Sequence, residues 1–194
     1  MGILTLTGDV FDLARHMRGY AVIGTNTATT PTKYPTPDWM PYRAVFGESI
    51  HRAVMGRGAA KQACQEMPGI EYCLGAWLEL LPLSREEQRG RVHAEAAQRP
   101  PAVFTDTGER PDGVDYLRLG VVCFMVTEAW WEPARLDLIE TQAGLLAQLI
   151  ESTPESPFLL TRVGCGNGGL DWRGVQPVLE EKLSGLENLF LVGL

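Results

Sequence analysis

Residues 121–126 (VVCFMV) form a run of six apolar residues that no polar residue interrupts. A strand with one solvent-facing side alternates polar and apolar residues, whereas a strand that helices cover on both faces is apolar throughout. The run therefore predicts a central strand, over residues 116–126, between two layers of helices. Other apolar segments predict strands at residues 3–6, 20–25, 102–105, 158–160 and 188–192.

Helices are predicted between these strands. Apolar residues recur at helical spacing from residue 134 to residue 151, as in an amphipathic helix. The remaining predicted helices are residues 58–67, 71–80 and 172–183. Pro177 is expected to distort or restart the last of these, and Asp171 is expected to cap its N-terminus. Strands and helices thus alternate through most of the chain, which is typical of a layered α/β fold.

Composition limits the partners of this chain. Its 194 residues, 45% of them hydrophobic, suffice for one domain with its own core. The formal net charge is −7 and Lys and Arg form no block, so the basic face needed for bulk nucleic-acid binding is missing. No apolar stretch approaches the roughly 20 residues that cross a bilayer, and no leader pattern opens the sequence. We expect a cytoplasmic monomer without a membrane partner.

Cysteine spacing argues against metal sites and disulfides. The four cysteines contain no C-x-x-C pair, and the three histidines do not cluster near them. Reduced cysteines are typical of cytoplasmic proteins. We therefore expect neither a metal nor a cofactor.

Two glycine-rich segments each precede a predicted helix. The first glycine loop, residues 55–60, reads MGRGAA, and the second glycine loop, residues 163–169, reads VGCGNGG. Glycine permits positive φ angles and lets a ligand approach the main chain closely, and a helix N-terminus offers free N–H groups to an anion. Each loop alone could equally be a tight turn that binds nothing. Two such loops in one small domain favour opposite sides of a single diphosphate.

The residues around both loops resemble macro domains. The first match is residues 54–62 with Pro68 after them, and the second is residues 162–172, which end in Gly-Leu-Asp-Trp. The resemblance is closest to the branch with DNA ADP-ribosyl glycohydrolase antitoxins, terminal ADP-ribose glycohydrolases and small phage ADP-ribose-1″-phosphate phosphatase-like proteins. It implies a three-layer α/β/α sandwich with a mixed, mostly parallel sheet. It covers the chain as one macro domain, residues 1–194, with inserted loops at about 27–49 and 84–113 that could form a lid.

The resemblance also implies roles for individual residues. Asp9 corresponds to the aspartate that contacts the adenine amino group, and Asn26 to an asparagine near the distal ribose. Trp130 corresponds to the tryptophan of a Phe-Pro-Thr/Val-Lys-x-x-Trp motif and is expected to stack on the ligand or to lie in the core. The residues expected to bind the ligand are Asp9, Val10, Asn26, Met55, Gly56, Gly58, Ala59, Val163, Gly164, Cys165, Gly166, Asn167, Gly168 and Trp130.

Two positions depart from the family pattern. Thr127 stands where the glycohydrolase branch has its lysine, and a threonine cannot form the covalent adduct of an activated lysine. Gly168 stands where some relatives have an aspartate. The remaining candidates for catalysis are Asn26, which could hold a water, Thr127 itself, and Glu128 as a general base. Lys33 and His51 are further alternatives, and Trp39 and Tyr42 are candidates for a lid.

These observations leave more than one function open. The chain is expected to bind ADP-ribose or a derivative and to hydrolyse an ADP-ribosyl or ADP-ribose-1″-phosphate linkage, with an ADP-ribosylated macromolecule as a further partner. The alternative is a non-catalytic reader or sponge of an ADP-ribose-based signal. A scaffold that has lost its ligand is disfavoured by the two glycine loops and Asp9.

Overall fold

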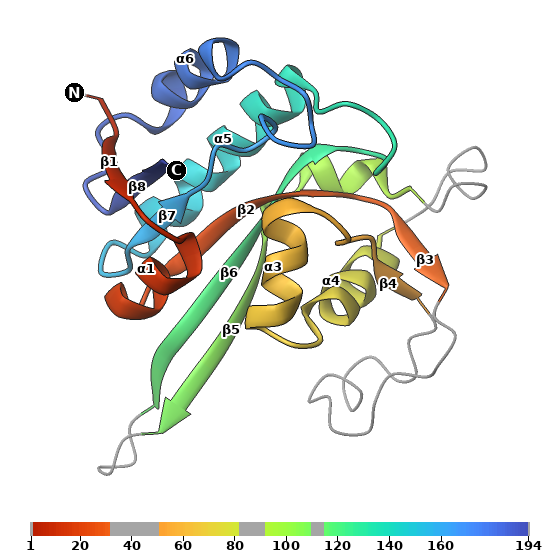
Figure 1. Ribbon diagram of the computed structural model, residues 1–194, viewed down its shortest axis with the longest axis horizontal. Coiled ribbons are helices and arrows are strands. Elements are labelled where there is room, and N and C mark those ends of the chain that lie inside the picture. The colour runs from red at the N-terminus through yellow and green to blue at the C-terminus, as the bar shows by residue number, and fades with distance from the viewer. Residues whose placement is uncertain (1, 32–50, 82–91, 110–114, 194) are drawn as a thin grey trace.

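The computed structural model describes residues 2–31, 51–81, 92–109 and 115–193 (Figure 1). Its main sheet has six strands in the order β1-β8-β7-β2-β6-β5, and every neighbouring pair except β5 and β6 is parallel. The strands are β1 Leu4–Thr7, β2 Tyr20–Asn26, β5 Ala102–Glu109, β6 Asp115–Thr127, β7 Phe158–Leu160 and β8 Leu189–Gly193. The predicted mixed, mostly parallel sheet is confirmed.

Helices cover both faces of this sheet (Figure 1). The helices are α1 Val10–Met17, α3 Gly58–Glu66, α4 Ile70–Glu79, α5 Leu136–Ser152 and α6 Trp172–Leu183, with a short 3-10 helix at Ala94–Gln98. Ile23 of β2 and Cys123 of β6 pack in one core with α1, α3 and α4. Val22 and Phe124, which precede or follow them in the same strands, pack in a second core with α5 and α6. The apolar run of residues 121–126 therefore supplies both cores at once, as the three-layer prediction requires.

Two predictions about helices are wrong. No helix was expected between the first two strands, yet α1 lies there. Asp9 caps its first turn, Arg18 ends it at φ 54°, and Phe11 and Ala14 are fully buried. The helix runs unbroken through Pro177, so the proline does not restart α6. Proline has no backbone N–H, so α6 loses one backbone hydrogen bond at this position.

A small hairpin-like sheet begins inside the segment expected to be an inserted loop. β3, Thr29–Pro31, pairs antiparallel with β4, His51–Ala53. The hairpin lies against α4 so closely that a Cβ atom on Gly75 would be 2.7 Å from the Cα atom of Arg52. The other candidates of that segment, Lys33, Trp39 and Tyr42, lie outside the described residues.

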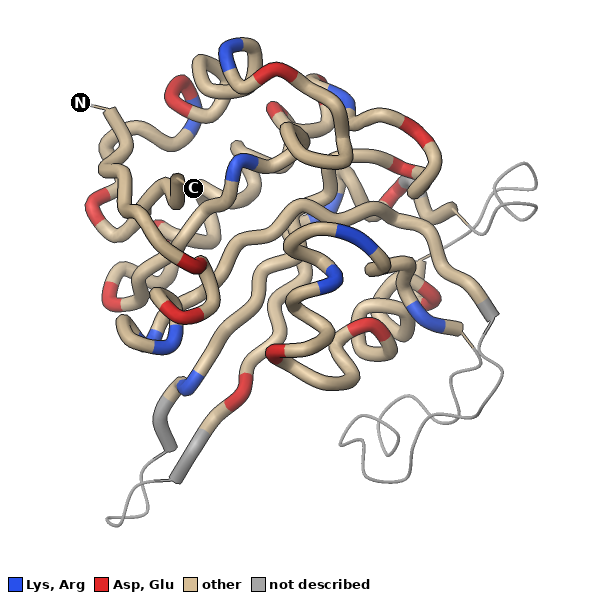
Figure 2. The backbone as a smooth tube through the Cα atoms, viewed as in Figure 1, with Lys and Arg blue, Asp and Glu red and all other residues tan. Residues whose placement is uncertain are grey.

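Basic and acidic residues are mixed along the described chain. Figure 2 shows Lys and Arg dispersed among the acidic residues over the described part of the chain. Within that part, no helix combines the length and the apolar character needed to span a membrane.

Candidate functional site

The two glycine loops meet in the folded chain, although the first lies between β4 and α3 and the second between β7 and α6. A Cβ atom on Gly58 would lie 3.1 Å from Nδ2 of Asn167. Gly58 itself has a φ of +53°, which favours glycine. Nδ2 of Asn26, at the end of β2, donates to the carbonyl of Val54 across 2.8 Å. This bond ties the first glycine loop to the carboxyl end of the central strands.

Among the described residues, no side chain caps the start of α3, where the first glycine loop leads into the helix. Arg57 is the N-cap, but its side chain makes no capping hydrogen bond and the first turn holds no acidic residue. The first amide to bond within the helix is that of Lys61, which donates to the carbonyl of Arg57. In the described residues, the amides of Gly58, Ala59 and Ala60 therefore have no acceptor. A helix N-terminus of this kind suits an anion.

The second glycine loop is shaped by its own backbone hydrogen bonds. The amide of Leu170 donates to the carbonyl of Gly164 across 3.0 Å, and the amide of Gly169 donates to the carbonyl of Gly166 across 3.1 Å. The amides of Gly166, Asn167 and Gly168 between them bond to none of the described residues. The loop thus offers three successive N–H groups, the arrangement that forms an anion-binding nest.

Two glycines of the second loop differ in the space around them. A Cβ atom on Gly168 would lie 2.5 Å from the carbonyl oxygen of Gly164, so no side chain fits there without a shift of the loop. An aspartate at this position would require a different backbone conformation of the loop. A Cβ atom on Gly166 would have no atom within 4 Å. Gly166 therefore borders open space where a ligand could lie.

Asp9 connects the end of β1 to both neighbouring helices. Its Oδ1 accepts from the amides of Phe11 and Asp12 at the start of α1, and its Oδ2 accepts from Nε2 of Gln62 in α3 across 2.6 Å. Burial raises the pKa of Asp9, but the hydrogen bonds from Gln62 and the two amides outweigh it, so the pKa lies below its ordinary value. Asp9 is thus an ionised acceptor whose second oxygen already holds an amide donor.

The side chains of Val10 and Met55 do not face the surface, so only the backbone of these residues could contact a ligand. Both side chains are buried in the core under α1 and α3. Val163 is buried as well, in the core on the opposite face of the sheet. Ala59 is half-buried against the first of these cores.

The three candidates for catalysis lie close together, and each side chain already forms a hydrogen bond or an ion pair with another residue of the protein. Asn26 and Thr127 are partners in the register of β2 and β6. Oδ1 of Asn26 accepts from the amide of Ala28. Thr127 is buried and donates to the carbonyl of Ala129 across 3.1 Å. Glu128 forms an ion pair with Arg135 at 2.8 Å.

The turn after β6 exposes both of its tryptophans. Trp130 and Trp131 are 50% and 55% exposed, and their rings lie 5.4 Å apart at 87°. In a strand, consecutive side chains point to opposite faces, so one of two neighbouring tryptophans would be buried. β6 ends at Thr127, so this alternation does not extend to Trp130 and Trp131. Neither indole belongs to the core, and the core reading of Trp130 is wrong.

His51, Cys64 and Cys165 are the histidine and cysteine side chains near the glycine loops. Nδ1 of His51 lies 3.9 Å from a carboxylate oxygen of Glu79 in α4, beside the hairpin. Burial raises the pKa of Cys64 to about 12 and also raises the pKa of Cys165 in the second loop. The four cysteines are free thiols, and in the described ranges no group of three His, Cys, Asp or Glu could hold a metal ion.

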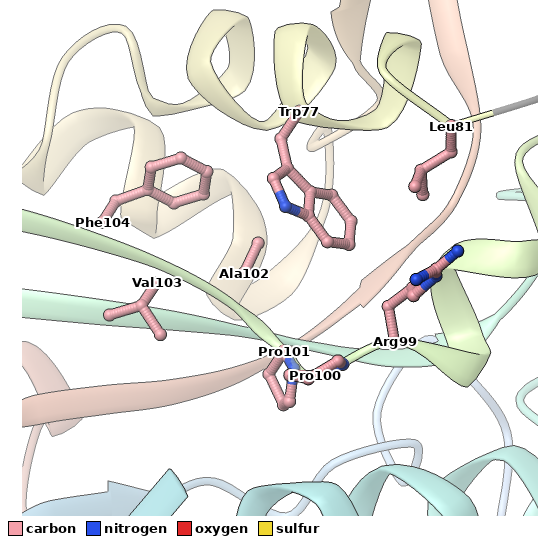
Figure 3. A pocket seen from close by; sticks show the side chains of 8 residues that line it. All are labelled: Trp77, Leu81, Arg99, Pro100, Pro101, Ala102, Val103 and Phe104. Carbon is pink, nitrogen blue, oxygen red and sulfur yellow. The ribbon is translucent and has the colours of Figure 1, made fainter. Parts of the chain in front are cut away.

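A pocket of about 410 Å³ lies elsewhere, between α4 and β5 (Figure 3). Its lining is mostly apolar and includes Trp77, Pro101 and Phe104. It shares no residue with either glycine loop, and the guanidinium in its lining, that of Arg99, is already paired with Glu95. Its chemistry does not suit a diphosphate.

Two residues of this region had no role in the sequence-based prediction: Gln62 and Arg135. Gln62 lies within the matched segment 54–62, but its bond to Asp9 joins residues 53 positions apart. Arg135 follows Glu128 by 7 positions across a turn. Pairing of this kind depends on the folded chain.

Known proteins resemble this chain in structure. No known protein-family model matches the sequence, and no curated protein matches it. The macrodomain of Mycobacterium tuberculosis DarG is 19% identical, with a TM-score of 0.64 over 100% of this chain and 99% of that one. The macrodomain of Thermus aquaticus DarG is 21% identical, with a TM-score of 0.62 over 99% and 97%. Thermosipho africanus DarTG, solved in complex with ADP-ribose, is 18% identical, with a TM-score of 0.61 over 96% of this chain and 40% of that one.

These neighbours match the architecture found here, a mostly parallel mixed sheet between two helical layers. The macro-domain resemblance of the sequence is thereby confirmed at the level of the fold. This chain has the macrodomain fold.

Proposed function

We propose that the two glycine loops bind the diphosphate of ADP-ribose or of an ADP-ribose derivative. One observation carries the proposal. The amides of residues 58–60 and 166–168 lack acceptors in the described chain, and the two loops that hold them meet at Gly58 and Asn167. Backbone N–H groups can hold phosphates without a basic surface, which fits the formal net charge of −7. The similarity in fold to DarTG, solved with ADP-ribose, supports the same ligand.

The two ends of the ligand would point to opposite sides of the loops. Asp9 is an ionised carboxylate beside the first glycine loop, and it is a suitable acceptor for the amino group of adenine. Adenine would take the place of the Gln62 amide on Oδ2. The distal ribose would then lie toward the carboxyl ends of β2 and β6, where Asn26 and Thr127 are neighbours. Asn26 would act by holding the first loop in position through Val54.

The proposed chemistry is hydrolysis of an ADP-ribosyl or ADP-ribose-1″-phosphate linkage. Glu128 is the candidate general base, because it lies next to Thr127 and its ion pair with Arg135 is at the surface. A surface ion pair contributes only about 0–1 kcal/mol, so Arg135 does not hold Glu128 firmly. The alternative is a non-catalytic reader or sponge. That alternative is favoured by Thr127, whose hydroxyl is buried and bonded to the carbonyl of Ala129.

The diphosphate assignment is tested by calorimetric titration with ADP-ribose. Gly166→Glu should abolish binding, because its carboxylate enters the open space that the phosphates would fill. Gly144→Glu is the matched control. It adds the same charge to α5 at a glycine whose Cβ atom would also have no neighbour within 4 Å. A folded Gly166→Glu protein with native affinity would show that the second loop does not bind the phosphates.

A further inference from the structure

Trp130 and Trp131 form an aromatic corner on the surface. Their ring planes are nearly perpendicular, at 87°, and about half of each residue is exposed. Two adjacent exposed indoles are uncommon on a soluble surface and mark interaction sites. Perpendicular rings leave an inside corner in which a small group can contact both faces.

Backbone hydrogen bonds fix this corner beside the proposed ligand site. At one end of the turn, the amide of Thr27 donates to the carbonyl of Glu128 across 3.1 Å. At the other end, the amide of Ala134 donates to the carbonyl of Gly168 in the second glycine loop across 2.9 Å. The tryptophans therefore lie on the turn after β6, which is hydrogen-bonded both to the residue that follows β2 and to the second glycine loop.

The surroundings of the corner are acidic. Residues 128–137 carry three carboxylates and one guanidinium, a formal net charge of −2. Arg135 is held by Glu128 and Asp137. The exposed carboxylate of Glu132, next to Trp131, forms no ion pair with any residue that the structure describes. A positive group would find an unused counter-charge at this point, whereas the phosphates of a nucleic-acid strand would be repelled.

We propose that Trp130, Trp131 and Glu132 bind the guanidinium of an arginine to which ADP-ribose is attached. This inference rests on the proposed function, because it identifies the acceptor at the distal ribose of the same ligand. A guanidinium substituted on one nitrogen keeps its charge, and its flat face stacks on indole. Indole is the aromatic ring that attracts cations most strongly. The substrate class is therefore an ADP-ribosylated arginine in a peptide.

Three ligands separate this inference from the proposed function. They are free ADP-ribose, a peptide ADP-ribosylated on arginine, and a single-stranded oligonucleotide ADP-ribosylated on a base. The native protein should bind the peptide more tightly than ADP-ribose. Trp131→Ala should lose about 2- to 30-fold in peptide affinity, the range expected for cation–π contacts, and should keep its affinity for ADP-ribose.

Two more variants isolate the charge. Glu132→Gln should also weaken peptide binding, whereas Glu187→Gln, which removes an exposed carboxylate before β8, should not. Trp131 and Glu132 are exposed, so both variants should fold, as an unchanged thermal midpoint would verify. Equal affinity of the native protein for peptide and ADP-ribose, a peptide preference that survives both variants, or a preference for the oligonucleotide would each overturn the inference. Absence of ADP-ribose binding by the native protein would instead overturn the proposed function, and the inference with it.

Discussion

Nε2 of Gln62 donates a hydrogen bond to Oδ2 of Asp9 across 2.6 Å, and this bond links α3 to the N-terminus of α1. The first glycine loop opens α3, so the same bond orients the loop toward the end of β1. The proposed adenine contact would use the oxygen that Gln62 now occupies.

Removal of Gln62 should raise the pKa of Asp9 toward its ordinary value. Burial alone raises that pKa, and the Gln62 bond is the largest of the contributions that lower it. A lowered pKa in the folded state gives stability that is present above the unfolded pKa and is lost as the pH falls through the folded pKa. Gln62→Ala should therefore lose part of this acid-sensitive stability. NMR titration of the Asp9 carboxyl measures the change, and Asp137, whose pKa is lowered by Arg135, should titrate as before.

Asp9 variants should separate adenine recognition from helix capping. Asp9→Ala and Asp9→Ser should both weaken ADP-ribose binding by about 1–3 kcal/mol, because adenine loses its acceptor. Both variants lose the bond to Gln62, but Asp9→Ala should be less stable than Asp9→Ser by about 0.5–2 kcal/mol, since serine still caps α1. Ribose 5-phosphate, which has no base, should bind all three proteins alike in calorimetry. Equal losses for both ligands would assign Asp9 to the fold instead.

Substitution by alanine should destabilise the protein at Gly168 but not at Gly166. Gly168→Ala should reduce the free energy of unfolding by about 1–3 kcal/mol, because its Cβ atom would lie 2.5 Å from the carbonyl oxygen of Gly164. Gly166→Ala should unfold in urea at nearly the native midpoint, since no atom lies near its Cβ position. A Gly168→Ala protein as stable as the native one would mean that the loop adjusts freely.

Single-turnover release of ADP-ribose should distinguish hydrolase from reader. The native protein should release ADP-ribose from a nucleobase slowly, since Thr127 supplies no ammonium. Thr127→Lys should gain some turnover, limited because a useful lysine also needs a lowered pKa and an aligned substrate. The gain is also limited because Thr127 is buried and gives up its bond to Ala129.

Glu128→Gln is the third arm of that experiment. Fast native release that this variant loses would make Glu128 the catalytic base and exclude the reader. Fast release that persists in Glu128→Gln would make Lys33, His51 or a water held by Asn26 the remaining candidates for the catalytic group. Tight product binding without release in any of the three proteins would establish the reader or sponge.

The sequence predicts the layers of this fold better than the contacts of its site. The apolar run in β6 and the helical spacing in α5 are local patterns, and both elements form where the patterns are. α1 was missed because Asp9 also reads as a turn after a strand. Its signal was the capping aspartate followed by apolar residues at positions 10, 11 and 14.

The partners of the site residues could not be read from local patterns. Asn26 bonds to a carbonyl 28 positions away, and Gln62 bonds to a carboxylate 53 positions away. Such pairs arise when the layers pack, so neither propensity nor spacing reports them. The exposure of Trp131 likewise follows from where β6 ends.

The pairing of β1 with β8 affects when the site can form during synthesis. β1 lies at one edge of the main sheet, and its neighbour β8 is the last of the described strands in the sequence, so closing this pair spans a very long stretch of chain. Contacts of such high sequence separation slow folding. On the ribosome, β1 must wait for β8 to emerge while the central strands can already assemble. Asp9 lies two residues after β1, so the nascent protein would assemble its two glycine loops before Asp9 could reach the position proposed for its adenine contact.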